Sequence, residues 1–126
     1  MRRELAALVA DAIPDLTGCA AYAGGPIPTG SAAVVESSEG ADIDDYCALR
    51  WNLEVWATAS ANDLAARSET FNTWAEQFAA ALTANPTLNR TASQVVIERV
   101  NPPTLMTSGG GDVLLLVIEL RPIEVV

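Results

Sequence analysis

The stretch DYCALRWNLEVWATAS, residues 45–60, sets the strongest limit on how this chain can fold. Apolar residues occupy every second position, and a period of two is typical of a β-strand with one face on a core. The positions between them carry aromatic and charged side chains. A strand that only covered a core would need no aromatic residues on this second face, which could be entirely polar. The predicted core residues of this strand are Leu49, Trp51, Leu53 and Val55.

The second face of the same strand contains the candidate contact residues. Aromatic residues and arginine are over-represented at protein interfaces, which favours contact with a neighbouring subunit. The alternative is a second core layer, with the N-terminal helix lying on that side of the sheet. Arg50 and Glu54 are too far apart along an extended strand to touch each other, so cross-strand or cross-subunit partners suit them better. The interface candidates are Tyr46, Arg50, Glu54 and Trp56.

Two segments have the apolar periodicity of helices. Leu5, Leu8, Val9, Ala12 and Ile13 share one helical face, and Pro14 ends that helix. A longer amphipathic helix is predicted over residues 61–83, with Ser60 and Asp63 as a capping box and an end before Pro86. Its apolar stripe is the natural cover for the apolar face of the long strand. The predicted core residues of this helix are Phe71, Trp74, Phe78 and Leu82.

The remaining strands are predicted from apolar runs bounded by turn residues. Residues 31–36 form a strand that pairs with the long strand as an antiparallel hairpin, and residues 18–23 allow a shorter one. Residues 94–100 are rich in β-branched side chains. The run VLLLVIEL, residues 113–120, suits a central strand buried on both faces.

The segments between these strands are predicted to be irregular. Residues 37–45 read as a polar loop, and residues 101–112 as a turn with a glycine-rich tip. Pro122 is expected to end the last strand. The whole chain, residues 1–126, is predicted to be a single α+β domain. It has a mostly antiparallel sheet of four to five strands, with an N-terminal helix and one long amphipathic helix packed on it.

The charge of the chain excludes some classes of function. The formal net charge is −9, and the basic residues are seven scattered arginines. Proteins that grip nucleic acid neutralise phosphates with clustered lysine and arginine, so an independent nucleic-acid binder is not expected. An acidic wall repels phosphate and is compatible with DNA sliding past. Glu4 and Asp11 interrupt the N-terminal apolar stretch, so neither export nor membrane insertion is expected.

The sequence offers little for catalysis. It contains no histidine, and no phosphate-binding or nucleophile motif occurs, so no catalytic residue, cofactor site or metal site is assigned. Cys19 and Cys47 do not have metal-ligand spacing and are expected to be reduced and buried. Four acids in residues 37–45 do not match a calcium-binding loop, and a solvated or pore-facing loop is the better reading. These acids are Glu39, Asp42, Asp44 and Asp45.

The order of these segments resembles a family of phage proteins. An N-terminal helix ends at a Pro-x-Leu motif and is followed by a loop that contains Gly and Pro. Next come a strand with the motif W-x-L-E-V-W, a helix that begins with S-A-N-D, and two final strands. This arrangement, over nearly the whole chain, resembles the tail terminator proteins of long-tailed bacteriophages, particularly those of actinobacterial hosts.

The resemblance implies a structural, non-enzymatic protein of the virion neck, assembled in the host cytoplasm. Such proteins form a ring, usually of six copies, that caps the tail tube and ends its polymerisation. The ring then offers a head–tail joining surface, and DNA passes through its lumen without sequence-specific binding. The implied partners are further copies of the chain, the tail tube protein and the head–tail connector. No cofactor is implied.

Two other functions remain open at this stage. Another neck or minor tail component, such as a stopper, has similar size and texture. A small ligand-binding or regulatory α+β domain would instead have a defined apolar pocket. Neither alternative requires catalytic residues.

Overall fold

The structure is a computed structural model that describes residues 2–21, 27–43, 48–60, 63–92, 94–108 and 111–125. For residues 37–43, 48–50, 64, 107–108, 111–112 and 123–125 it describes the backbone alone. The elements are α1 (Arg2–Ala12), β1 (Cys19–Ala20), β2 (Ala32–Ile43), β3 (Ala48–Ser60), α2 (Leu64–Ala84), β4 (Gln94–Val100), β5 (Thr104–Ser108) and β6 (Gly111–Val125).

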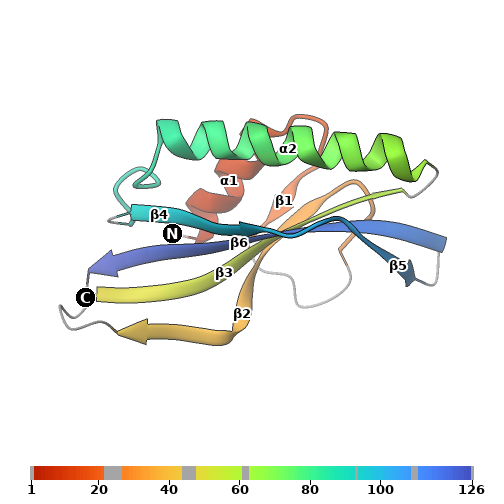
Figure 1. The fold of residues 1–126 in the computed structure, drawn as a ribbon. Coiled ribbons are helices and arrows are strands. Elements are labelled where there is room, and N and C mark those ends of the chain that lie inside the picture. The colour runs from red at the N-terminus through yellow and green to blue at the C-terminus, as the bar shows by residue number, and fades with distance from the viewer. Residues whose placement is uncertain are drawn as a thin grey trace.

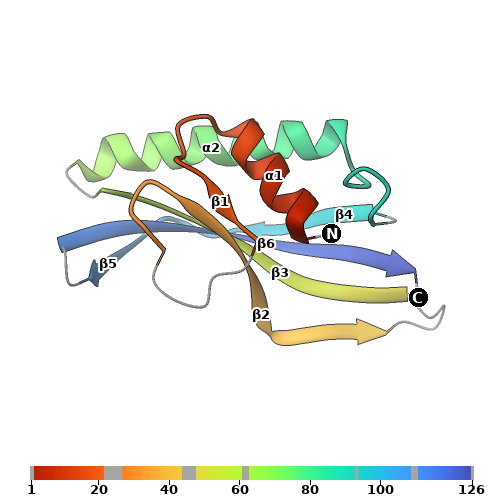
Figure 2. The ribbon, with the colours of Figure 1, turned by 180° about the vertical axis from the view of Figure 1, so that it is seen from behind.

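The architecture is α+β, as predicted, and the sheet is mostly antiparallel. The strands lie in the order β1-β2-β3-β6-β4, and β5 pairs with β6 on the same side as β4. Among the described strand pairs, β1 and β2 alone run parallel. Both helices lie against one face of the sheet (Figures 1 and 2). The expectation that the N-terminal helix could cover the other face is therefore wrong.

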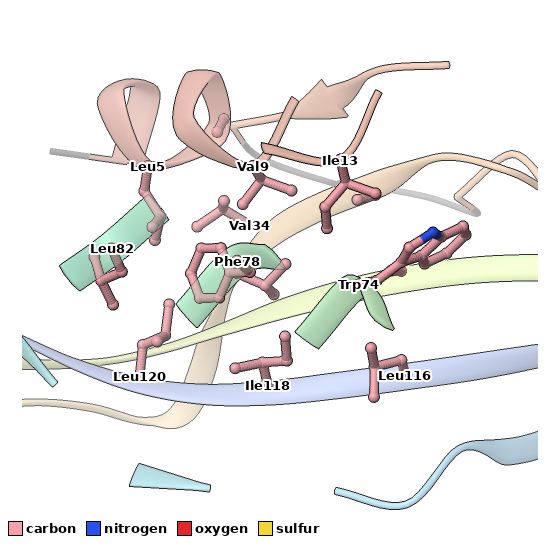
Figure 3. Packing of buried hydrophobic residues seen from close by; sticks show 14 of the residues in the cluster. Leu5, Val9, Ile13, Val34, Trp74, Phe78, Leu82, Leu116, Ile118 and Leu120 are labelled. Atoms are coloured by element: carbon pink, nitrogen blue, oxygen red, sulfur yellow. The ribbon is translucent and has the colours of Figure 1, made fainter. Parts of the chain in front are cut away.

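The core fills the space between this face and the helices. Leu5 and Val9 of α1, and Ile13 directly after it, point toward the sheet (Figure 3). Trp74, Phe78 and Leu82 of α2 lie beside them. The sheet supplies alternate residues of β3 and β6, all almost fully buried: Leu53, Val55, Ala57, Leu114, Leu116, Ile118 and Leu120. Phe71 is also buried and meets Trp74 edge-on, with ring centroids 5.2 Å apart. Trp51 is half-buried at the margin, where the Arg2 guanidinium lies 5.4 Å from its ring centroid.

Several boundaries differ from the sequence-based predictions. The predicted loop over residues 37–45 is wrong for its first part, because β2 continues to Ile43. Pairing with β3 overrides the polar composition, and a register shift between Glu36 and Ala41 absorbs the surplus residues. Glu39 and Asp42 therefore lie on a strand. This shift coincides with the sharp bend of β2 in Figure 2.

The C-terminal hairpin also departs from prediction. The predicted turn contains β5, which pairs with the start of β6 and adds a strand to the sheet. Pro122 does not end β6, which runs on to Val125. The ladder between β3 and β6 skips Arg121 and Pro122 and resumes at Ile123. The missing N–H of the proline is accommodated at this gap.

The ends of α2 show why helix boundaries are hard to predict. Asp63 is the N-cap, and its carboxylate accepts a hydrogen bond from the Ala66 N–H at 3.2 Å. The capping box with Ser60 is therefore wrong, because Asp63 itself holds the cap position. After α2, Leu88, Asn89 and Arg90 all have positive φ. This left-handed turn places the Leu88 side chain fully in the core.

Candidate subunit interface

The sheet face opposite the helices, here called the distal face, is built by the other alternate residues of β3 and β6. Among the described residues, no helix covers it (Figures 1 and 2). It combines apolar, acidic and basic side chains within two neighbouring strands, whereas the helix-covered face of the same strands is apolar. Its residues are Asn52, Glu54, Trp56, Thr58, Leu115, Val117, Glu119 and Arg121.

Trp56 lies near the centre of the distal face and is half-buried. Its cross-strand neighbours are Ala33 on β2 and Val117 on β6. The indole Nε1–H donates a hydrogen bond of 2.7 Å to Glu54 Oε2. Two of the predicted interface residues are thus brought together, and this bond fixes the indole along β3. Trp56 contributes large apolar area in a fixed orientation, which is the property of an interface anchor.

Glu54 stands directly opposite a second acid, Glu119 of β6. Like charges at opposed positions of an antiparallel pair repel each other. Each carboxylate accepts a hydrogen bond from a neutral donor: Glu54 from Trp56, and Glu119 from Asn101 Nδ2 at 3.2 Å. These two donors are neutral, and the basic residue that the register sets beside the pair is Arg99 of β4, the cross-strand partner of Glu119. The centre of the distal face therefore combines an aromatic ring with an acidic pair, which favours partners that donate hydrogen bonds or carry positive charge.

A polar network borders this centre. Arg121 Nη2 donates to Asn52 Oδ1 at 3.4 Å, and Arg121 Nε lies 3.1 Å from Glu98 Oε1 of β4. Sequence reasoning did not single out Glu119 or Arg121. The pairing of β3 with β6 joins segments that are far apart in the sequence, so their contacts leave no local pattern. The one local sign of Glu119 was an acid inside the otherwise apolar run VLLLVIEL.

The other predicted interface and loop residues are described less fully. Arg50 is the register partner of Asp42 on β2 and of Ile123 on β6, with backbone positions alone described. Glu39 likewise has a described backbone position, on β2. Leu49, predicted to be in the core, is described by its backbone in β3. Tyr46, Asp44, Asp45 and Cys47 lie outside the described residues.

Exposed apolar side chains gather at one edge of the sheet. All the large hydrophobic residues found exposed in the described part of the chain lie on β4 and β5. Between 40% and 49% of their surface is accessible, whereas the large apolar residues of β3 and β6 are mostly buried. Scattered exposed apolar residues are common, but their concentration on β4 and β5, which lie along the same side of β6, makes this edge a candidate contact surface. These residues are Val96, Val100, Leu105 and Met106.

Within the described residues, the groups that could react or bind a ligand are a cysteine and one groove. The described residues contain no group of three or more His, Cys, Asp or Glu that could hold a metal ion. Burial raises the pKa of the Cys19 thiol to about 11, which disfavours the reactive thiolate at neutral pH. A groove of about 410 Å³ lies between α1 and the end of α2. Half of its lining residues are apolar (Ala7, Leu8, Ala12 and Ala81) and half are polar (Glu4, Asp11, Asn85 and Asn89), whereas ligand pockets are lined mostly by apolar residues.

Comparison with known proteins adds no further assignment. No model of a known protein family matches the chain, and a search of curated protein sequences finds no match. None of the described helices combines the length and apolar character that crossing a membrane requires.

Proposed function

We propose that this chain is the ring-forming subunit of a tail terminator in a long-tailed bacteriophage. In this proposal the ring caps the tail tube, ends its polymerisation and provides the surface for joining the head. The chain is then a structural virion protein whose partners are further copies of itself, the tail tube protein and the head–tail connector. The observation that carries the proposal is the distal face, which presents Trp56 and its acidic neighbours on the side of the sheet opposite both helices.

A closed ring needs two different contact surfaces on each subunit, because neighbours meet head to tail. The chain offers one on the distal face and a second along the exposed apolar edge of β4 and β5. A subunit that used only one self-complementary patch would stop at a dimer. Two distinct surfaces on one small domain therefore support a ring.

The strongly acidic composition suits a passage for DNA. Six copies with a charge of −9 each carry −54 in total. A lumen with this sign repels phosphate and offers no sites at which DNA would be held. Under this proposal the acids of β2 and of the segment that follows it, Glu39, Asp42, Asp44 and Asp45, line or border the lumen.

The Trp56→Ala variant tests this function most directly. Removing a central aromatic anchor should raise the concentration needed for half-maximal assembly by about tenfold or more. Negative-stain electron microscopy and native mass spectrometry over a concentration series would measure the loss of rings. Trp56→Phe is the matched control, since it keeps an aromatic ring and most of the apolar area but loses the indole N–H that bonds to Glu54.

Two outcomes would count against the proposal. If Trp56→Ala assembles as well as the wild type, the distal face is not the contact. If the variant unfolds the monomer, as judged by circular dichroism, Trp56 serves the core of the subunit. A wild-type protein that forms only dimers at every concentration would favour a small binding domain over a ring.

A further inference from the structure

The two edges of the sheet are unequal, and each leaves backbone groups without a strand partner. On one side, β1 pairs only with Ala32 and Ala33, so within the described residues no strand flanks the outer side of β2 from Val34 to Ile43. On the other side, β4 is the last strand of the sheet order. Free edges of this length attract further strands, and proteins usually block them.

The hydrogen bonds of β4 show which of its amides point outward. Asn101 donates its N–H to Val117 O of β6 at 2.9 Å, so the alternation of an antiparallel ladder turns the Val100 N–H away from β6. At the other end, the Val95 N–H points away from β6 and donates to Pro86 O. The same alternation turns the Ile97 N–H outward. The outer edge of β4 thus offers donors at Ile97 and Val100, beside the exposed side chain of Val100.

We infer that the β4 edge of one copy adds to the outer edge of β2 in a neighbouring copy, so that the sheet continues from subunit to subunit. This inference rests on the proposed self-association of the chain. It names the backbone contact through which neighbours join, and it does not depend on a role in a phage tail.

Strand direction supports this pairing. Along the sheet, β2, β3, β6 and β4 alternate in direction, so β4 runs opposite to β2. Rotation about an axis along the strands keeps these directions, and β4 then meets the neighbour's β2 as an antiparallel pair. The repeat continues without a mismatch, and successive copies can close into a ring.

Charge favours unlike edges over like edges. After Val35, β2 contains three acids and no basic residue; Glu36 is paired with Arg2 of α1, and Glu39 and Asp42 follow it. On β4, Glu98 is paired with Arg121, and Arg99 is exposed. Pairing β2 with a second β2 would bring two acidic strands together, whereas pairing β2 with β4 sets acids beside Arg99.

The contact also continues the distal face from one copy to the next. On that face Val96 stands beside Arg121 of β6, and Val35 stands beside Glu54 of β3. When β4 joins the neighbour's β2 so that Arg99 lies beside Glu39 and Asp42, the distal faces of the two copies form one continuous surface. Val96 lies on this surface at the junction, and Trp56 of the neighbour lies one strand in from it, on β3.

A mixing experiment tests this inference. Val100→Pro removes an outward donor without touching the β6 ladder, and it blocks the β4 edge. The double variant Glu39→Arg/Asp42→Arg places positive charge on the β2 edge, so this edge repels Arg99 of the neighbour's β4. Each variant alone should need about tenfold more protein to assemble, equivalent to the loss of about one hydrogen bond.

An equimolar mixture should form a 1:1 heterodimer in native mass spectrometry, because each variant retains the edge that the other lacks. Val100→Ala is the control that keeps the N–H and should assemble.

Each other outcome has a definite meaning. If both folded variants assemble as rings, or if their mixture stays monomeric, the edge contact is wrong and the ring must form otherwise. If the wild type itself never self-associates, the proposed function fails and this inference fails with it. Should Val100→Pro not fold, hydrogen exchange on the wild type decides: the amides of Ile97 and Val100 should be protected in the assembly and exchange freely in the dilute monomer. Equal exchange in both states would overturn the inference.

Discussion

The helix-covered face and the distal face of the sheet are made by alternate residues of the same two strands, β3 and β6. On the covered face, Leu53 and Val55 meet two helices and are almost fully buried. On the distal face, Glu54 and Trp56 hydrogen-bond to each other, and Glu54 faces a second acid across the ladder. The covered face is specified by burial alone. The distal face keeps charge and aromatic area together, which costs stability in a single chain, and under the proposed function a neighbouring copy would offset this cost.

The largest expected effect lies on the covered face. Phe78→Ala should lower the free energy of unfolding by about 3–5 kcal/mol, because it opens a cavity at a fully buried ring. Urea unfolding followed by circular dichroism would measure the change. Gln77→Ala, on the exposed side of α2, should stay within about 0.5 kcal/mol of the wild type. A loss below about 1 kcal/mol for Phe78→Ala would mean that α2 does not pack as described.

The reactivity of the Cys19 thiol reports how well the margin of the covered face is shielded from solvent. Its raised pKa of about 11, against 9.0 for an unburied thiol, lowers the thiolate fraction at pH 8 by a factor of about a hundred. In a Cys47→Ser background, Cys19 should react with iodoacetamide more slowly by about that factor in the folded chain than in urea. The folded state favours the protonated thiol, so stability is fully present below pH 9 and falls between pH 9 and about pH 11. Equal labelling rates would place Cys19 in solvent.

A matched pair of valines compares the two faces directly. Val55→Ala, on the covered face, should cost about 2 kcal/mol from lost burial and a small cavity. Val117→Ala, half-buried on the distal face, should cost about 1 kcal/mol or less in the monomer. Both values come from urea unfolding below the assembly concentration. Equal costs would show that the distal face is packed as tightly as the covered face within one subunit.

The smallest effect concerns the turn that delivers Leu88 to the covered face. Arg90 has φ +68° and an exposed side chain, so Arg90→Gly should stabilise the monomer by about 0.5–1 kcal/mol. Thermal unfolding would detect the shift, with Arg90→Ala as a control that keeps the strain. Destabilisation by Arg90→Gly would mean that the Arg90 side chain makes contacts of its own.

The fold class followed from local pattern, but several element limits did not. The helical stripes and the period of two in residues 45–60 depend on neighbours along the chain, and β4 has the predicted bounds, residues 94–100. The extension of β2, the formation of β5 and the passage of β6 through Pro122 depend on partners far away in sequence. Backbone pairing then outweighs polar composition or a missing donor, and no local pattern records it.

The same distinction applies to the candidate site. That Glu54 and Trp56 share one face was predictable, because a strand has a period of two. That Glu54 would stand opposite Glu119 was not, since the register between β3 and β6 is fixed only when the whole core assembles. The opposed acids are therefore visible only in the structure, although the acid inside the run VLLLVIEL was the clue.

The longest ladder of the sheet also sets how the chain must fold. Pairing of β3 with β6 joins Ser60 to Val113 and Ala48 to Val125, with all of α2, β4 and β5 in the loop between them. Such non-local contacts are closed late and slow the search for the native state. Until β6 pairs with β3, the edge of β3 in the β2–β3 hairpin has no strand beside it. Partly folded chains can then pair with one another through this edge. Refolding should therefore succeed best in dilute solution, even though the finished subunit is proposed to work crowded against its own copies.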